Sequence, residues 1–255
     1  MSGPVNRGTR LGFDTVELNA PGHRNALSLD MLARLLDAVR ASAAGTSRGL
    51  VLTHAGTAFC AGVDLKERSG LARSDSAHSD LLSLLLRELW AYQKPVVAMV
   101  DGATRGGGMG LLACADIVLA VEGSTFAYAE ARVGVAPALV MAVTLPSTDS
   151  RSLLPYLLGA GPFDARTAQR LGLVSEVLPS PDAGALDDTL NALRSGAPGA
   201  LITIKRLARE WSAPQVDRLI REMTALSAQL FATQEAAEGM AAFAQRRPPN
   251  WLGSR

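Results

Sequence analysis

Apolar residues follow two different spacings along this chain, and the two spacings alternate. Short runs rich in apolar and β-branched residues predict strands at positions 10–19, 49–54, 95–100, 116–121, 124–128 and 174–178. Apolar residues three and four apart predict helices at positions 29–43, 80–92, 138–145, 150–158 and 164–171, and the pattern stays helical from 181 to about 245. Strands and helices that alternate in short units are typical of a layered α/β fold.

Local signals refine this outline. Ser28 stands directly before the helical pattern that starts at Leu29, so we expect it to cap that helix. Residues 55–68 fit neither spacing, and residues 69–79 are small and polar, so we expect a mobile loop over 69–79. The sequence GAPG at 196–199 marks an expected junction between an α/β core, residues 1–196, and a helical appendage, residues 197–255.

The stretch from Lys94 to Asp116 joins a predicted strand to a short apolar helix through three consecutive glycines at 106–108. The start of a helix presents unpartnered backbone N–H groups, which suit a bound anion or a polarised oxygen. Glycine allows a ligand to approach the backbone closely. The pattern is neither a P-loop nor a G-x-G-x-x-G dinucleotide fingerprint. We interpret it as a candidate oxygen-binding loop, with a tightly packed turn as the alternative.

Composition and charge narrow the class of protein. The 255 residues carry a formal net charge of +1, which indicates neither a nucleic acid nor a membrane surface as partner. No apolar run reaches the ~18 residues of a membrane-spanning helix, and the first ten residues lack the apolar core of a signal peptide. Cys60 and Cys114 lie in apolar stretches, so we expect reduced thiols in a cytoplasmic protein. His23, His54 and His78 have no metal-ligand spacing, so no metal site is predicted.

A second glycine-bearing loop, Gly62-Val63-Asp64, follows another predicted strand. Two such loops at the ends of neighbouring strands would direct two backbone N–H groups at one oxygen. That arrangement is an oxyanion hole, which suits a developing enolate or a tetrahedral oxyanion. The alternative is that both loops are ordinary strand exits. Lys66, in the same segment, is either a contact for a phosphate-bearing ligand or a solvated side chain.

Glu130 is the carboxylate whose surroundings best suit acid/base chemistry. It lies between two alanines, in an apolar segment that extends from Phe126 to Val133. Burial among apolar groups raises the pKa of a carboxyl group toward neutrality, where it can both accept and donate a proton. The alternative is an ion pair with Arg132 or another arginine.

Six motifs resemble the enoyl-CoA hydratase/isomerase family, the crotonases. They are HRNALS at 23–28, FCAGVDLK at 59–66, DGATRGGGMGLLACADIVLA at 101–120, FAYAEARVGVAP at 126–137, FDARTAQRLGLVSEV at 163–177 and EGMAAFAQRR at 238–247. They extend over nearly the whole chain in the order and spacing of the family. The set is specific, although each motif by itself is weak.

This resemblance implies a spiral of repeated ββα units, followed by C-terminal helices that build a homotrimer, often paired into a hexamer. It also implies an acyl-CoA thioester as substrate, so coenzyme A is part of the substrate and no separate cofactor is expected. The thioester oxygen would be held by the backbone N–H groups of Val63 and Gly107, with Glu130 as the catalytic carboxylate. The positions that contact coenzyme A in the family fall on Ala26, Leu27, Asp64 and Lys66.

The chain departs from the hydratases of this family at one important position. Those enzymes carry two glutamates that position a water; the second corresponds to Glu130, but the first corresponds to Gly110. A glycine-rich segment of the family is also replaced by ALVM at 138–141. We favour hydration of a 2-enoyl-CoA, because hydratases are frequent in the family. A single carboxylate also suits double-bond isomerisation through an enolate, which is the second hypothesis. A non-catalytic acyl-CoA binding protein is the third hypothesis.

Overall fold

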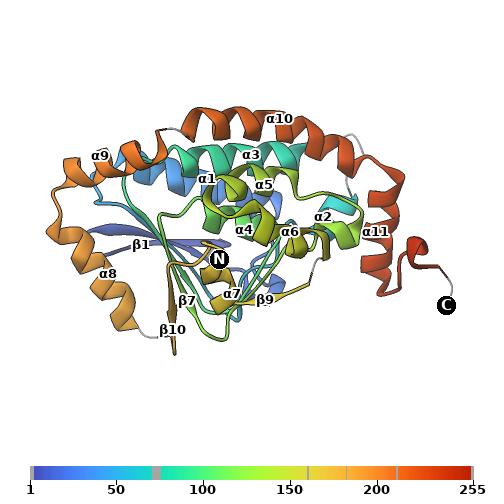
Figure 1. Cartoon of the computed structure of the whole chain (residues 1–255), viewed down its shortest axis with the longest axis horizontal. Coiled ribbons are helices and arrows are strands. Elements are labelled where there is room, and N and C mark those ends of the chain that lie inside the picture. The colour runs from blue at the N-terminus through green and yellow to red at the C-terminus, as the bar shows by residue number, and fades with distance from the viewer. Residues whose placement is uncertain (1–2, 71–75, 160, 182, 211, 254–255) are drawn as a thin grey trace.

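The computed structural model describes residues 3–70, 76–159, 161–181, 183–210 and 212–253 (Figure 1). Its strands form two sheets, with orders β1-β2-β3-β5-β7-β10 and β4-β6-β8-β9. The first sheet contains β1 (Val5–Arg10), β2 (Phe13–Leu18), β3 (Leu50–His54), β5 (Val96–Val100), β7 (Ile117–Val121) and β10 (Glu176–Leu178). The second contains β4 (Ala58–Cys60), β6 (Ala103–Arg105), β8 (Thr125–Ala127) and β9 (Phe163–Asp164). The predicted α/β fold class is confirmed.

Three successive pairs of strands give the fold its repeat. β3, β5 and β7 are parallel neighbours in the first sheet. The strands that directly follow them, β4, β6 and β8, are parallel neighbours in the second sheet. A helical segment follows each pair. Each unit therefore adds one strand to each sheet, as the predicted spiral of ββα units requires.

The strand expected at 10–19 is instead a hairpin of two strands. β1 pairs antiparallel with β2, with Val5 opposite Leu18. Leu11 and Gly12 between them have φ of 49° and 82°, the positive values that tight hairpin turns prefer. The interior residues of β1 are exposed, so no apolar pattern indicates this strand in the sequence.

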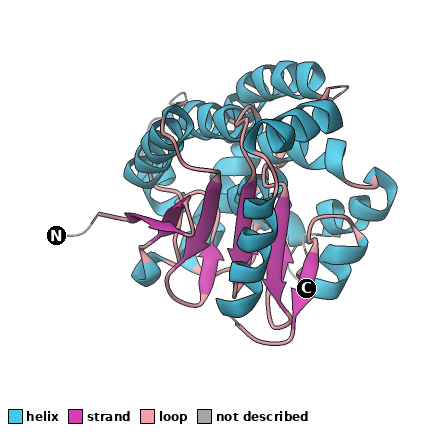
Figure 2. Ribbon diagram, turned by 90° about the vertical axis from the view of Figure 1, so that its left-hand side faces the viewer, coloured by secondary structure: helices cyan, strands magenta, loops and turns pink. Residues whose placement is uncertain are grey.

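Long helices cover the first sheet on the side drawn uppermost in Figure 1, where α1 (Leu29–Ala44), α3 (Ala77–Trp90) and α10 (Ala213–Phe231) lie one above another. The turned view shows the strands below these helices (Figure 2). Ser28 Oγ accepts a hydrogen bond from the N–H of Met31, which confirms the predicted N-cap. Within the described ranges, no helix combines the length and apolar character needed to cross a membrane.

Short elements account for most differences from the predicted outline. Residues 55–68 contain β4 and the start of α2 (Leu65–Gly70), and β6 and β9 were also missed. Strands of two or three residues are too short to show a spacing of their own. The loop expected over 69–79 was too long at both ends, because α2 extends to Gly70 and α3 begins at Ala77; residues 71–75 lie outside the described ranges. The remaining helices between the strands are α4 (Gly107–Ala113), α5 (Ala138–Thr144), α6 (Ser150–Gly159) and α7 (Ala165–Arg170).

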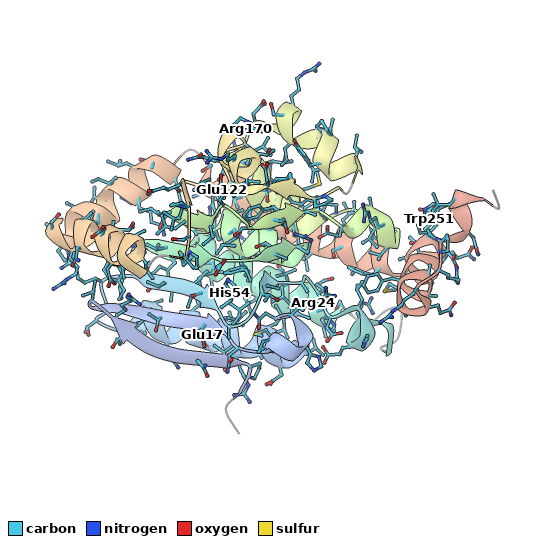
Figure 3. The ribbon with its side chains drawn as sticks, turned by 90° about the horizontal axis from the view of Figure 1, so that it is seen from below. Glu17, Arg24, His54, Glu122, Arg170 and Trp251 are labelled. Carbon is cyan, nitrogen blue, oxygen red and sulfur yellow. The ribbon has the colours of Figure 1, made fainter. Side chains whose placement is uncertain are left out.

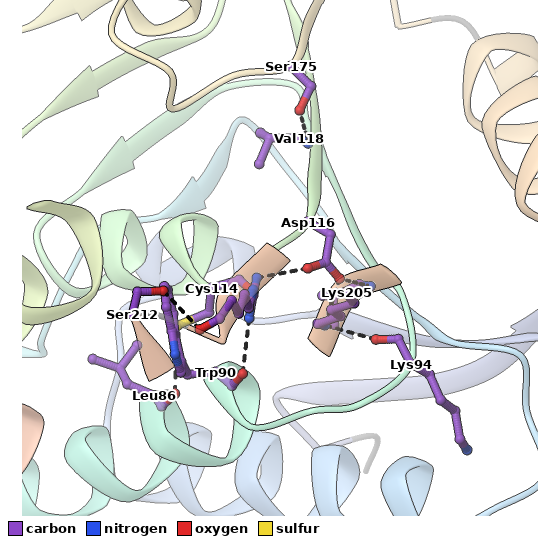
Figure 4. A network of polar contacts seen from close by, with 11 residues as sticks. Leu86, Trp90, Lys94, Cys114, Asp116, Val118, Ser175, Lys205 and Ser212 are labelled. Carbon is purple, nitrogen blue, oxygen red and sulfur yellow. Dashed lines mark hydrogen bonds and ion pairs between the residues drawn. The ribbon is translucent and has the colours of Figure 1, made fainter. Parts of the chain in front are cut away.

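The C-terminal part is helical as expected, with α8 (Ala183–Ser195), α9 (Pro198–Arg209), α10 and α11 (Gln234–Gln245). Asp116, directly before β7, forms ion pairs that join α9 to the sheet (Figure 4). Its carboxylate lies 2.6 Å from Lys205 Nζ and 2.8 Å from Arg209 Nη2, and it accepts the N–H of Val96. The predicted junction at 196–199 falls between α8 and α9.

Candidate active site

A cavity of about 390 Å³ lies at the ends of β4 and β6 and extends between α3, α5 and the last two helices. Of the residues predicted from the sequence, Val63, Gly107 and Glu130 line it. They come from three different units of the spiral, so the fold brings together residues that are far apart in the chain. Most of the remaining lining is apolar, including Leu65, Leu82, Leu139, Val140, Phe231 and Phe243.

The N–H group of Val63 is free because of how its loop pairs. Leu27 donates its N–H to the carbonyl of Gly62 and accepts the N–H of Asp64. These two bonds straddle Val63 in a parallel bridge, so the backbone of Val63 itself faces away from Leu27. No acceptor for the N–H of Val63 is found in the described part of the chain.

The glycine loop meets the Val63 loop directly. Gly106 has a φ of +50°, and a Cβ atom placed on it would lie 3.5 Å from the Cα of Gly62 and 3.0 Å from Oε1 of Glu130. A side chain at this position would therefore crowd the carboxyl group of Glu130, whereas its contact with Gly62 would be an ordinary van der Waals contact. Gly107 begins α4, and its N–H also lacks an acceptor among the described residues. The two unpaired amides and the carboxyl group thus converge around Gly106.

Burial governs the chemistry of Glu130. The residue as a whole is half-buried, but its Oε2 atom has almost no exposed surface and no hydrogen-bond partner among the residues that the structure describes. Loss of solvation raises the pKa of this carboxyl group from 4.5 to about 7, and the backbone amides of Glu130 and Ala129 oppose the shift only in part. No ion pair of Glu130 with Arg132 or any other described arginine is found. The environment therefore gives a carboxyl group that exchanges protons near neutral pH.

Apolar side chains fill the space beside Gly110. A Cβ atom on this glycine would lie 3.1 Å from Cδ2 of Leu86 and 3.7 Å from Cγ2 of Val140. Val140 belongs to the altered segment 138–141, which forms the first turn of α5. Apolar packing therefore occupies the place where the family resemblance leads us to expect the first glutamate.

The four positions predicted to contact coenzyme A lie beside the cavity and are not part of its lining. Leu27 is fully buried, and its Cδ1 lies 2.8 Å from a Cβ placed on Gly107. Asp64 Oδ1 accepts the N–H groups of Lys66 and Glu67, so this carboxylate caps α2. Ala26 is half-buried and Lys66 is exposed. Their contacts with coenzyme A stay a prediction.

Two arginines of the cavity lining were not singled out from the sequence. Arg24, which is labelled in Figure 3, is exposed and has a left-handed backbone conformation with a φ of 50°. Arg105 donates from its guanidinium to the carbonyl groups of Thr104 and Thr125. Burial, together with the nearby charge of Arg24, lowers the pKa of Arg105. Arginine beside a glycine loop is the signal that would have indicated this positively charged rim.

Comparison with known proteins agrees with the fold. A model of the enoyl-CoA hydratase/isomerase family matches residues 10–254, so the chain belongs to this family. It is 32% identical over 247 residues to a 2,3-dehydroadipyl-CoA hydratase from Escherichia coli, covering 92% of this chain and 93% of that protein. It is 31% identical to an enoyl-CoA hydratase from Mycobacterium tuberculosis, covering 92% and 91%. The crystal structure of an enoyl-CoA hydratase from Mycobacterium avium superimposes with a TM-score of 0.87 at 33% identity, covering 98% of this chain and 100% of that one.

Proposed function

We propose that this chain adds water to a 2-enoyl-CoA thioester. The observation that carries the proposal is the meeting of two unpaired backbone amides with an isolated carboxyl group whose pKa is about 7. Membership of the enoyl-CoA hydratase/isomerase family and the names of two relatives at about 31% identity support it. In this proposal coenzyme A is part of the substrate and lies along Ala26, Leu27, Asp64 and Lys66.

The proposed reaction passes through an enolate. Ionised Glu130 removes a proton from water while the water oxygen forms a bond to the β-carbon. The electron pair of the double bond moves toward the thioester, whose oxygen becomes negative and is stabilised by the N–H groups of Val63 and Gly107. Glu130, now protonated, then delivers its proton to the α-carbon. One carboxyl group therefore serves as base and acid, and is ionised again at the end.

Double-bond isomerisation is the second candidate, and the apolar wall at Gly110 favours it. Glu130 would remove the α-proton of a 3-enoyl-CoA, the same two amides would stabilise the dienolate, and the proton would return at the γ-carbon. This reaction needs no water, so the absence of a carboxylate at position 110 would not impair it. A third candidate is an acyl-CoA binding protein that lacks turnover.

Product analysis in H₂¹⁸O distinguishes these candidates. Purified wild-type protein and Glu130→Gln are incubated with 2-enoyl- and 3-enoyl-CoA esters of several chain types, and the products are identified by mass spectrometry. We expect ¹⁸O at the β-carbon with wild type and none with Glu130→Gln. Migration of the double bond without ¹⁸O would identify an isomerase. Tight binding by calorimetry without conversion of any ester would identify a binding protein.

A further inference from the structure

Among the described residues, three of the five side chains that α3 and α10 contribute to the cavity lining are polar. His78 and Ser79 belong to the first turn of α3, and Ser227 lies on α10. Only 3%, 6% and 7% of their respective surfaces are exposed. Buried polar groups in proteins normally have hydrogen-bond partners.

The hydrogen-bonding capacity of this cluster is not used up by the protein. Ser79 Oγ and Ser227 Oγ lie 3.2 Å apart and have no other partner in the described ranges, so one of their two O–H donors is left over. His78 Nε2 lies 3.0 Å from Oε2 of Glu67, whereas Nδ1 is buried without a partner in the described part of the chain. Because a carboxylate only accepts hydrogen bonds, Nε2 carries a proton, and in the neutral imidazole Nδ1 then keeps a lone pair. The cluster offers one spare donor and one spare acceptor.

The start of α3 adds further donors. Ser76, at the N-cap position, makes no side-chain cap bond, because its hydroxyl donates to Asp80 instead. The backbone N–H groups of His78 and Ser79 have no acceptor among the described residues, as is usual for a first helical turn. These groups favour an acceptor oxygen. The carboxylates of Glu67 and Asp80 stand close by and oppose a negative charge, and the guanidinium of Arg68 over the Phe231 ring offsets them in part. Charges of both signs near the cluster favour an uncharged oxygen.

The cluster lies about one helical turn from the proposed thioester position. A Cβ atom on Gly107 would be 3.5 Å from Cδ2 of Leu82, and one on Gly110 would be 3.1 Å from Cδ2 of Leu86. α3 therefore runs along the glycine helix. Ser79 precedes Leu82 by three residues, which is about 4.5 Å along a helix axis. That offset corresponds to a few carbon atoms of an acyl chain.

We propose that Ser79, Ser227 and His78 bind an uncharged oxygen substituent on the acyl chain, and so make this chain selective for hydroxylated or keto-bearing acyl-CoA thioesters. A hydroxyl group matches the cluster best. It accepts from the spare serine O–H, and its own proton suits the lone pair of Nδ1. This inference rests on the proposed function, because it takes the cavity to hold the acyl group.

The test compares matched substrates. Wild-type protein is assayed with 2-enoyl-CoA esters of six, eight and ten carbons, each in three forms that end in a methyl, a hydroxyl or a carboxyl group. The readout is the ratio of kcat/KM for the hydroxyl form to that for the methyl form. We expect a ratio of about ten or more at one chain length, because the hydroxyl form pairs buried groups that the methyl form leaves unpaired. The carboxyl form should be disfavoured at that length.

The neighbouring turn of the same two helices offers a matched control. Ser83 and Thr224 also join α3 to α10, with their hydroxyl oxygens 2.7 Å apart, but they are not part of the cavity lining. Ser79→Ala combined with Ser227→Ala should bring the ratio close to one. Ser83→Ala combined with Thr224→Val should leave it at the wild-type value. Thermal unfolding of both double variants reports any general loss of structure.

Other outcomes would overturn the inference. A ratio near one at every chain length, with methyl esters turned over, would reject the polar subsite and leave the proposed function standing. A preference that survives in the Ser79→Ala, Ser227→Ala variant, or one for the carboxyl form, would also reject it. If no ester is turned over, the proposed function fails, and the same ratio from calorimetric dissociation constants decides the inference by itself.

Discussion

At the scale of single residues, Glu130 makes no ion pair with any residue that the structure describes, and it lies against the glycine loop. Its Oε2 atom is buried without a hydrogen bond, and its Oε1 atom faces Gly106. Burial raises the pKa to about 7, so both protonation states are populated at neutral pH. This is the property that a single residue needs if it is to act as base and then as acid.

The pH dependence of activity follows from this pKa. For hydration, Glu130 must be ionised before it can take a proton from water. We therefore expect kcat/KM to rise as the pH increases through about 7 and to level off above it. The measurement is the pH profile of kcat/KM between pH 5.5 and 9, with Glu122→Gln as a control that should keep the wild-type profile. A flat profile across this range would contradict the role of Glu130.

The same pKa predicts a pH-dependent cost in stability. The pKa of Glu130 in the folded protein, about 7, lies above the ordinary value of 4.5. Between these pH values the folded protein still binds the proton that the unfolded chain has lost, so the free energy of unfolding falls as the pH rises. Glu130→Gln removes this effect. The free energy of unfolding of the variant should exceed that of wild type by about 3 kcal/mol at pH 8, and by much less at pH 5. Urea unfolding at both pH values, at one protein concentration, measures the difference; an equal gain at both would exclude a titrating Glu130.

Gly106 is predicted to be essential for the placement of that carboxyl group. Gly106→Ala puts a Cβ atom 3.0 Å from Oε1 and also strains a backbone with a φ of +50°. A displaced catalytic group typically costs about 10²-fold in rate, so kcat should fall by that order. Gly123→Ala is the control, because no atom lies within 4 Å of its added Cβ. Equal kcat values for the two variants would show that Gly106 does not control Glu130.

At the scale of elements, the C-terminal helices are fastened to the sheet by charges as well as by apolar packing. Asp116 retains 22% exposure, Arg209 16% and Lys205 only 9%. Loss of solvation, only partly offset by Asp116, lowers the pKa of Lys205 to about 8. The ammonium group nevertheless bonds to Asp116 and to the carbonyl of Lys94. These contacts join α9 to the segments that precede β5 and β7.

Asp116→Ala should therefore destabilise the fold strongly. It leaves two partly buried cations without their shared counter-charge, and such losses typically cost about 3–5 kcal/mol. Glu122→Ala removes the exposed pair with Arg166 and serves as the control, with an expected change below about 1 kcal/mol. Denaturant unfolding measures both variants. A comparable small change in both would mean that α9 is held by its apolar contacts alone.

At the scale of the whole molecule, the chain exposes large apolar side chains that a single copy leaves uncovered. On α9, Ile204 is 62% exposed and Leu207 51%. At the opposite end, Trp251 is 46% exposed and stands at the right-hand edge of Figure 3. Exposed apolar patches mark interaction surfaces in soluble proteins. The homotrimer or hexamer implied by the family resemblance stays a prediction, and α9 is the surface on which it is most directly tested.

Light scattering after size exclusion is the measurement for this prediction. Wild-type protein should have the mass of three or six copies. Ile204→Glu combined with Leu207→Glu should lower the measured mass toward that of one copy, because assembly would then bury unpaired charges at the interface. Leu158→Glu on α6, where 72% of the side chain is exposed, provides a control that should keep the wild-type mass. A monomeric wild type would refute the predicted assembly.

Sequence patterns were sufficient to predict the long helices and strands and several candidate residues. The helix capped by Ser28, the buried strands of the first sheet and the isolated setting of Glu130 all depend on residues close together in the chain, so local spacing indicates them. The motifs also indicated the family. β1, β4, β6, β9 and α2 were not recovered, because their few residues are specified by pairing with partners remote in sequence.

What only the tertiary structure decided is how separate units meet. Gly62, Gly106 and Glu130 come into contact because successive ββα units stack parallel strands, and no local pattern encodes that distance. The apolar packing beside Gly110 depends on Leu86 and Val140, which belong to two other helices. The Ser79–Ser227 pair joins residues that are 148 positions apart in the chain. The sequence by itself thus determined the longer elements, the family and the candidate carboxylate. The packing of units decided the shape and polarity of the cavity, because these arise from contacts between residues distant in the chain.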